Sequence, residues 1–343
     1  MEIPTEKAYN PSWLDRPLTS VLPRLNLATV LIAAILLVAV VSRFYNVDLR
    51  VMSHDEVNHV VPSYDLYQGR GYQHNPVTHG PFQFHIVALS YFLLGDSDFS
   101  ARVPALLFSI ATVAAVLLLF PRYLGKTGAI AAGLFFLISP YMLFYGRYVR
   151  NEAFVALYGV LTLYAILRYM DRGDRFSLFL LTAASVMHVV TKETSFIYTA
   201  QTLLFLAFVF IDNISRMPWP STGRRNGFLL LIGGSILLLG AALGLAAWNA
   251  ALMKNAGEAA AQAGLTPLQA GEIVAVAAAL MVAVLAIITL IRSIGMQAIR
   301  SLRSFDLLIL VGTMILPQLA PFPVKIVGAA LGAGWSPLDY SAA

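Results

Sequence analysis

The sequence predicts an all-α, polytopic membrane protein with about nine transmembrane helices. Hydrophobic residues make up 58% of its 343 residues and charged residues only 12%, whereas a water-soluble domain carries about 25% charged residues. The mean hydropathy is +0.73. Uncharged stretches close to the roughly 20 residues that a spanning helix needs recur along the chain. These observations exclude a soluble globular enzyme, a disordered chain and a nucleic-acid-binding protein.

The predicted spans are the apolar stretches that charged residues bound on either side. They are 25–42, 103–121, 127–146, 153–167, 176–191, 194–211, 226–253, 273–291 and 307–324. Two of them are shorter than about 17 residues and can borrow flanking residues. A turn-rich stretch at 217–223, MPWPSTG, predicts a cytoplasmic connection.

The apolar segment 82–95 is the ambiguous element, because about 14 residues is more typical of an interfacial helix than of a span. If it does not span and the N-terminus is cytoplasmic, fourteen of the 23 Lys and Arg residues lie inside and nine outside. If it does span, these numbers are reversed, against the positive-inside bias. We therefore place 82–95 at the outer surface of the membrane.

This topology divides the chain into three parts. Residues 1–24 form a cytoplasmic segment before a retained signal anchor, since no small-residue cleavage site follows the first apolar run. Residues 25–324 form the transmembrane domain, and its long outer loop covers 43–102. Residues 325–343 form an outer-side tail, and its uncharged end leads us to expect that the natural protein continues.

Ionisable side chains beside membrane spans are costly and by default indicate a functional site. Asp55 and Glu56 lie in the first outer loop, about a dozen residues past the first span. Adjacent residues on a helix diverge by about 100°, so only one of the two can face a substrate, while the other can orient it or bind a metal. The alternative is that they are solvated loop acids.

Further charged residues lie at the outer ends of later spans. Arg147 and Arg150 are three apart, which aligns them on one face of a helix and suits a phosphate. Glu152 follows directly, and Lys192 and Glu193 lie between two later spans. The alternatives are arginines that anchor the helix at the headgroups and an ion pair within a hairpin.

The chain contains no cysteine, so thiolate metal sites and cysteine nucleophiles are excluded. Histidine spacings in the outer loop differ from the HExxH zinc pattern. No metal site is therefore certain. A divalent cation, Mg or Mn, held by Asp55 and Glu152 is compatible with the oxygen ligands present.

Four short motifs lie in the outer loop and at the outer ends of the spans: Asp55-Glu56, His79-Gly80-Pro81, Arg102-Val103-Pro104 and Arg150-Asn151-Glu152. Together they resemble the GT-C superfamily of membrane glycosyltransferases, of the protein O-mannosyltransferase and aminoarabinose transferase type and the prokaryotic proteins associated with flippase activity or N-glycosylation. By this resemblance Asp55 matches the catalytic aspartate of the first outer loop, and the second motif matches a histidine-proline-proline-like turn with Gly80 in place of the first proline. The third motif matches an arginine-leucine-proline motif, and the fourth an arginine-x-acidic element. The resemblance covers roughly residues 27–212.

The resemblance implies an inverting glycosyltransferase at the outer face of the plasma membrane. Its partners would be a polyprenyl-phosphate sugar donor, a protein, lipid or glycan acceptor, and membrane lipids, with no nucleic acid. Asp55 would be the general base, with Glu56 beside it at the catalytic position. Candidates for binding the substrate or its phosphate are Arg102, Arg147, Arg150, Glu152, Lys192, Glu193 and His79.

Two other classes of function remain open. A transporter or flippase for lipid-linked sugars would also place basic residues near a headgroup, although transporters typically hold their sites at the bilayer midplane. A non-catalytic subunit of a membrane complex would tolerate the replacement Asp55→Asn.

Overall fold

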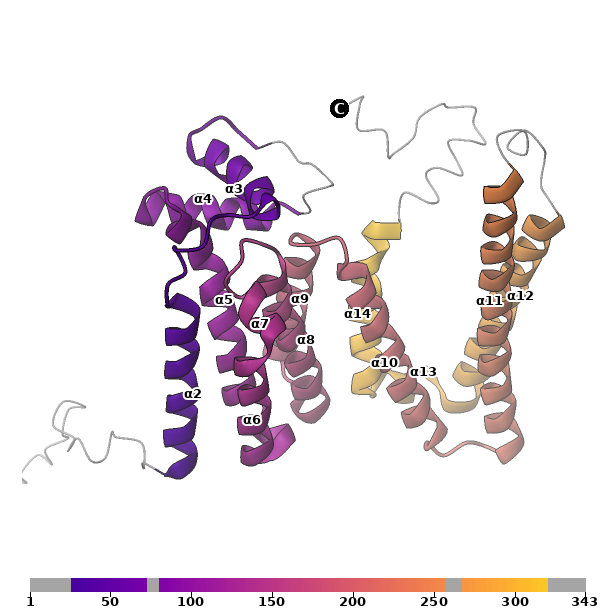
Figure 1. Cartoon of the computed structure of the whole chain (residues 1–343). Coiled ribbons are helices and arrows are strands. Elements are labelled where there is room, and N and C mark those ends of the chain that lie inside the picture. The colour runs from indigo at the N-terminus through magenta and orange to yellow at the C-terminus, as the bar shows by residue number, and fades with distance from the viewer. Residues whose placement is uncertain (1–25, 73–79, 257–266, 320–343) are drawn as a thin grey trace, which may run out of the picture. The chain divides into compact units, whose positions relative to one another are not determined.

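The chain is described by a computed structural model, which covers residues 26–72, 80–256 and 267–319. Every regular element in these residues is a helix, and they form two compact units, Met1–Tyr198 and Thr199–Ala343 (Figure 1). The predicted all-α class is therefore confirmed. The predicted segments 1–24 and 325–343 lie outside the described residues.

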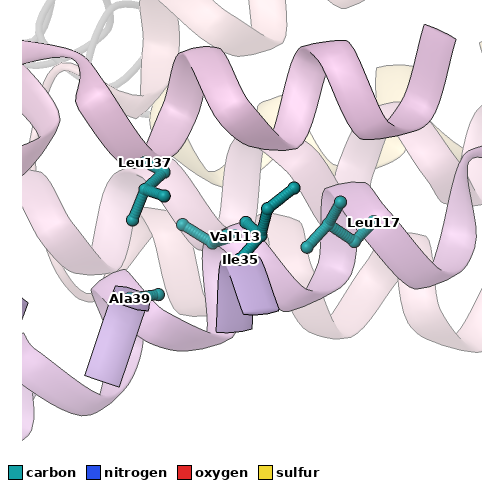
Figure 2. Close-up of a cluster of buried hydrophobic side chains, with 5 residues drawn as sticks. All are labelled: Ile35, Ala39, Val113, Leu117 and Leu137. Carbon is teal, nitrogen blue, oxygen red and sulfur yellow. The ribbon is translucent and has the colours of Figure 1, made fainter. Parts of the chain in front are cut away.

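The first unit contains eight described helices. They are α2 (Leu27–Phe44), α3 (His54–Tyr67), α4 (Phe82–Leu94), α5 (Asp98–Leu119), α6 (Pro121–Ile138), α7 (Pro140–Tyr145), α8 (Glu152–Arg172) and α9 (Arg175–Val189). The long helices α2, α5 and α6 share a buried apolar cluster of Ile35, Ala39, Val113, Leu117 and Leu137, shown in Figure 2. Because these side chains come from three separate helices, their packing fixes the three helices against one another.

A buried arginine reinforces this packing at the end of α2. The guanidinium of Arg43 is completely buried and donates to the carbonyl oxygens of Phe136 and Leu137, at 3.3 and 3.2 Å, and to the Ser109 hydroxyl. The two carbonyls belong to the last turn of α6, where helix carbonyls have no partner within the helix. A cation is also favoured at this negative end of the helix dipole. Arg43 therefore ties α2 to α5 and α6.

Helices α3 and α4 cover one end of these long helices, and α4 runs crosswise to α5 (Figure 1). Val87 and Tyr91 of α4 are buried against Ala101 of α5 and Val149. From α3, the Tyr64 and Tyr67 rings pack on Tyr91, with centroids 6.3 and 5.9 Å apart. The 13-residue α4 is one of the shorter apolar helices, as predicted for 82–95, and its side of the membrane stays a prediction.

The second unit begins within α10 (Ser195–Ser215). It continues with α11 (Thr222–Ala256), α12 (Pro267–Ile294), α13 (Met296–Arg300) and α14 (Arg303–Leu319). Its buried cluster contains Ile214, Phe228, Ala286, Leu290 and Ile299. The connection predicted at 217–223 corresponds to the break between α10 and α11, where the Trp219 indole donates to the Ile214 carbonyl at 2.9 Å.

Six described helices are long and apolar enough to cross a membrane: α2, α5, α8, α10, α11 and α12. Each overlaps one of the nine predicted spans. The short predicted span 153–167 is extended at both ends to 21 residues in α8, whereas α9 keeps only 15 residues. The count of nine spans and their orientation stay predictions.

One predicted span is interrupted. The stretch 127–146, predicted to be continuous, consists of the end of α6 and the short helix α7, with a break at Ser139. Ser139 has non-helical backbone angles (φ −54°, ψ 122°) and its hydroxyl accepts from the Met142 amide, so it caps α7. The cause is Pro140, since the residue before a proline avoids the helical region.

Candidate functional site

Glu56 and Asp55 begin α3 and face in different directions. Ser53 caps the helix: its hydroxyl accepts from the Glu56 amide, while the Glu56 carboxylate accepts from the Ser53 amide. This reciprocal capping box directs the Glu56 side chain back toward the start of the helix. Glu56 is completely buried, whereas the side chain of Asp55 is 53% exposed. Of the two predicted catalytic carboxylates, only Asp55 is open to a substrate.

Glu56 is the centre of a buried ion-pair cluster. Its carboxylate accepts from Arg102 Nε at 3.0 Å, from Arg50 at 2.8 Å and from the backbone amide of Val149 at 3.2 Å. Burial raises the pKa of Glu56, but the hydrogen bonds from Arg102 and Ser53 together lower it by more. The pKa of Glu56 therefore lies below its ordinary value. The carboxylate is therefore ionised at neutral pH.

Arg102 was expected to contact substrate or phosphate, and the structure places it elsewhere. Its guanidinium is completely buried, and beyond Glu56 it donates to the carbonyl oxygens of Val47 and Arg50, at 2.7 and 3.0 Å. Because Nε, Nη1 and Nη2 are all engaged, Arg102 ties the loop after α2 to the start of α5. This geometry fits a structural ion pair and not a phosphate ligand.

A second chain of charges joins four of the predicted site residues. Arg150 donates to Asp55 at 2.9 Å and lies 3.6 Å from Glu152, and Lys192 donates to Glu152 at 2.8 Å. Asp55 lies on α3, Glu152 begins α8 and Lys192 lies in the turn between α9 and α10. The structure thus brings together residues 137 positions apart in the sequence, in an alternating row that we call the Asp55–Lys192 row.

The turn carrying Lys192 is held in place by the start of α4. The backbone amides of Gly80 and Phe82 donate to the carbonyls of Thr191 and Val190, at 3.2 and 3.1 Å. A Cβ atom at position 80 would lie 2.2 Å from the Val190 oxygen, so only glycine permits this approach. Gly80 is where the sequence motif departs from the proline of the family, and the close contact explains the glycine.

Arg147 and Arg150 do not share a helix face, contrary to the prediction from their spacing. The residues from Gly146 to Asn151 form a non-helical turn between α7 and α8. Arg147 donates to the Tyr45 carbonyl at 2.5 Å, at the end of α2, while Arg150 reaches Asp55. Residues three apart lie on the same face only within a helix, and Arg147 and Arg150 lie in a turn.

Of the two remaining predicted residues, the structure describes one. Glu193 lies exposed in the turn between α9 and α10. His79 lies outside the described residues, so its predicted role stays a prediction.

Sequence reasoning missed Arg50 and its aromatic support. The Arg50 guanidinium lies 4.9 Å from the centre of the Tyr148 ring and 5.6 Å from that of Phe144. The Tyr148 hydroxyl is hydrogen-bonded to Ser53. The only signal in the sequence was a basic residue six positions before Glu56, in a loop whose path no pattern predicts.

Asn151 was named from the sequence only as the middle residue of the arginine-x-acidic element, and its side chain was assigned no role. It is buried between the two charged residues of the arginine-x-acidic element, and neither polar atom of its side chain has a hydrogen-bond partner within the described part of the chain. A buried amide of this kind usually has a partner. Asn151 is therefore a buried polar group beside Arg150 and Glu152 whose side chain has no partner among the described residues.

Two pockets lie near these residues. One, of about 380 Å³, is lined by Val47, Arg50, Pro140, Leu143, Phe144 and Arg147. The other, of about 350 Å³, lies between α4 and α5 and is lined almost entirely by apolar side chains, among them Leu89, Leu93 and Leu107. The first pocket combines cations with apolar walls, and the second has no charged lining residue.

The described residues do not fit a divalent cation. No three His, Asp or Glu side chains gather in the ranges that the structure covers. Asp55 and Glu152, the two predicted ligands, are both paired with Arg150, whose guanidinium a cation would have to displace. We therefore derive no step through a metal.

The fold defines a multi-pass, all-α membrane protein, and the charged row lies at one end of its first unit. Residues 78–233 match the family model of the dolichyl-phosphate-mannose-protein mannosyltransferases. This match supports a membrane glycosyltransferase of the GT-C superfamily, so the resemblance drawn from the motifs is confirmed. The matched range contains Arg102, Arg150 and Lys192, whereas Asp55 precedes it. No curated protein and no solved structure matched the chain.

Proposed function

We propose that the protein transfers a sugar from a polyprenyl-phosphate donor to a protein, lipid or glycan acceptor at the outer face of the plasma membrane. The observation that carries this proposal is the position of Asp55, an exposed carboxylate held by Arg150 at the end of the Asp55–Lys192 row. The family match supports glycosyl transfer in general. The donor, the acceptor and the side of the membrane are our inference.

Asp55 is the proposed general base, because a base must reach the proton that it removes. The acceptor's O–H or N–H proton passes to the Asp55 carboxylate as the acceptor atom attacks the anomeric carbon. The bond from that carbon to the phosphate oxygen breaks, and polyprenyl phosphate leaves with both electrons of the bond. Attack from the face opposite the leaving group inverts the configuration.

Arg150 is the proposed positioning residue for Asp55. Its guanidinium contacts Asp55 and lies near Glu152, and Lys192 in turn holds Glu152. Fixing a catalytic group in the reactive geometry removes orientational freedom that the reaction would otherwise have to lose. Glu56, buried below Asp55, supports the same end of α3 through its pairs with Arg102 and Arg50.

The leaving phosphate gains negative charge as the bond breaks, so cations placed beforehand stabilise the transition state more than the ground state. Arg147, Arg150 and Lys192 are the predicted cations. Arg150 and Lys192 already have carboxylate partners, whereas Arg147 donates to a backbone carbonyl.

The outer-face assignment rests on the whole predicted topology, in which fourteen of the 23 Lys and Arg residues lie on one side of the membrane and nine on the other. The fourteen include five residues at the ends of α5 to α9 opposite Asp55: Arg122, Lys126, Arg168, Arg172 and Arg175. Basic residues in short loops favour the cytoplasmic side. The end carrying Asp55 is then the outer end.

The test is a transfer assay in membranes containing the full chain, with a panel of radiolabelled polyprenyl-phosphate sugars. Asp55→Asn is compared with Asp65→Asn, which removes an exposed carboxylate from the same helix α3. We expect the Asp55 variant to lose transfer by about 10²-fold or more, since general bases contribute 10²–10⁴-fold, and the Asp65 variant to keep it.

Transfer that survives Asp55→Asn would sink the assignment of the base. Movement of the lipid-linked sugar across the membrane without any transfer would favour a transporter instead. Unchanged function of both variants in cells, with no transfer from any donor, would favour a non-catalytic subunit.

A further inference from the structure

Three arginines lie near the start of α3, and two of them pair with its one buried carboxylate. Arg50 and Arg102 both pair with Glu56, at 2.8 and 3.0 Å, and Arg147 lies close enough to both arginines for their charges to lower its pKa. The largest cause of that lowered pKa is burial of Arg147. Asp48, on the same loop, is exposed and forms no ion pair with any described residue. The cluster therefore keeps an excess of positive charge.

The Asp55–Lys192 row has no such excess. Its two cations, Arg150 and Lys192, alternate with its two carboxylates, Asp55 and Glu152. A bound anion would have to compete with carboxylates already within hydrogen-bonding distance of these cations. Arg50 also has a carboxylate partner, but it shares Glu56 with Arg102, and Arg147 donates only to a backbone carbonyl. An anion is thus better accommodated beside Arg50 and Arg147 than beside Arg150 and Lys192.

Arg50 and Arg147 line one pocket of about 380 Å³, together with Val47, Pro140, Leu143 and Phe144. The side chain of Arg50 is 43% exposed, and the faces of the Phe144 and Tyr148 rings support its guanidinium. Planar guanidinium groups match the geometry of phosphate oxygens, with two donors directed at one anion. The pocket therefore presents two phosphate-binding groups on an apolar wall.

The position of the pocket indicates how its ligand is carried. Arg147 donates to the carbonyl of Tyr45, the residue that directly follows α2, and α2 is a candidate membrane span. A pocket at the end of a spanning helix would lie where lipid headgroups meet the hydrocarbon. We propose that the Arg50–Arg147 pocket binds the phosphate group of a membrane lipid, with the apolar lining against the first carbons of its chain.

Binding of a lipid phosphate stands without the transferase; only the identification of that lipid as the sugar donor rests on the proposed function. The phosphate of a polyprenyl phosphate and that of a phospholipid headgroup offer the same oxygens to the two arginines. Direct binding measurements separate these sources.

The experiment is native mass spectrometry of the purified full chain with three probes: a long-chain polyprenyl monophosphate, the matching uncharged polyprenol and phosphatidylglycerol. The variants are Arg147→Gln, Arg147→Lys and, as an exposed arginine outside the pocket, Arg70→Gln. We expect Arg147→Gln to weaken binding of the phosphate lipid by about tenfold or more, from the strength of hydrogen bonds to charged groups. Arg147→Lys should weaken it less, and Arg70→Gln should leave it unchanged.

Each outcome has a defined meaning. Selective binding of polyprenyl phosphate that Arg147→Gln weakens supports the pocket and assigns the donor lipid to it. Equal binding of phosphatidylglycerol supports the pocket as a headgroup site. Binding of the uncharged polyprenol as tight as that of its phosphate, or equal effects of Arg147→Gln and Arg70→Gln, overturns the inference, provided that the melting temperatures show folded variants.

The same measurements distinguish this inference from the proposed function. If lipid phosphate binds and depends on Arg147 but no sugar is transferred from any donor, the pocket stands and the transferase falls. If transfer occurs while Arg147→Gln leaves phosphate binding intact, the transferase stands and the pocket is wrong.

Discussion

Replacing Glu56 with glutamine would show how strongly the buried ion pair holds the starts of α3 and α5 together. The substitution keeps the side-chain volume but removes the charge, and it turns an amide NH₂ toward groups that are themselves donors. The Glu56 carboxylate accepts five hydrogen bonds, three of them from Arg50 and Arg102. Removing one partner of a buried pair costs about 3–5 kcal/mol, because the other charge stays buried without compensation. We expect the free energy of unfolding to fall by this amount.

The assay is equilibrium unfolding of the purified protein in detergent, followed by helical circular dichroism. Asp65→Asn is the control, since its pair with Arg70 is exposed and such pairs contribute at most about 1 kcal/mol. The double variant Glu56→Gln with Arg102→Met should recover part of the loss, since it removes both charges. A loss at Glu56 no larger than that at Asp65 would refute the assignment of a buried structural ion pair.

The same carboxylate predicts a dependence of stability on pH. The pKa of Glu56 is lower in the folded protein than its ordinary value of 4.5. A depressed carboxyl pKa contributes stability above the unfolded-state pKa, and this contribution is lost as the pH falls through the folded-state pKa. The wild type should therefore lose more stability below pH 4.5 than Glu56→Gln does. Equal acid sensitivity of the two proteins would contradict the pKa assignment.

Further substitutions test the backbone contact, the helix clamp and the separation of the two turn arginines. Gly80→Ala places a Cβ atom 2.2 Å from the Val190 carbonyl oxygen, so it should lower the free energy of unfolding by about 1–3 kcal/mol. Gly159→Ala is the control, since a Cβ atom there has open space around it and should not lower stability. Melting temperatures of the two variants check both expectations. Arg43→Met leaves two α6 carbonyls without their donor and should cost about 1–3 kcal/mol in unfolding free energy. Arg147→Gln and Arg150→Gln should each reduce kcat/KM for transfer, and in the double variant the two losses of transition-state stabilisation should add, so that the fold-reductions multiply. A double variant no worse than either single variant would contradict separate roles.

Much of the fold follows from the sequence because span length and charge are simple physical limits. Six of the nine predicted spans correspond to helices long and apolar enough to cross a membrane. The short length of 82–95 predicted an interfacial helix, and the helix found there, α4, has 13 residues. That α4 does not span the membrane stays a prediction. The break at Ser139 was missed, although Pro140 gave a local signal, because hydrophobicity alone does not show where a helix is interrupted.

The site was less predictable, because its contacts depend on how helix ends meet in space. Asp55, Arg150, Glu152 and Lys192 were each singled out, but no spacing showed that they would form one alternating row. The sequence predicted that only one of Asp55 and Glu56 can face a substrate, but not which one. Which of the two is buried depends on the Ser53 cap, since that cap sets where the helix begins.

The turn between α7 and α8 shows why sequence spacing misled the assignment of the phosphate ligands. On a helix, Arg147 and Arg150 would act on the same anion. In the turn, one is directed to the loop after α2 and the other to α3. The turn can thereby separate two tasks. Arg150 is neutralised by Asp55 and can orient it, while Arg147 lines the pocket with Arg50 and pairs with no carboxylate of the described residues. A base and a phosphate must occupy different places during an inverting displacement, since the acceptor and the leaving group lie on opposite faces of the anomeric carbon, and a turn provides that separation where a continuous helix would not.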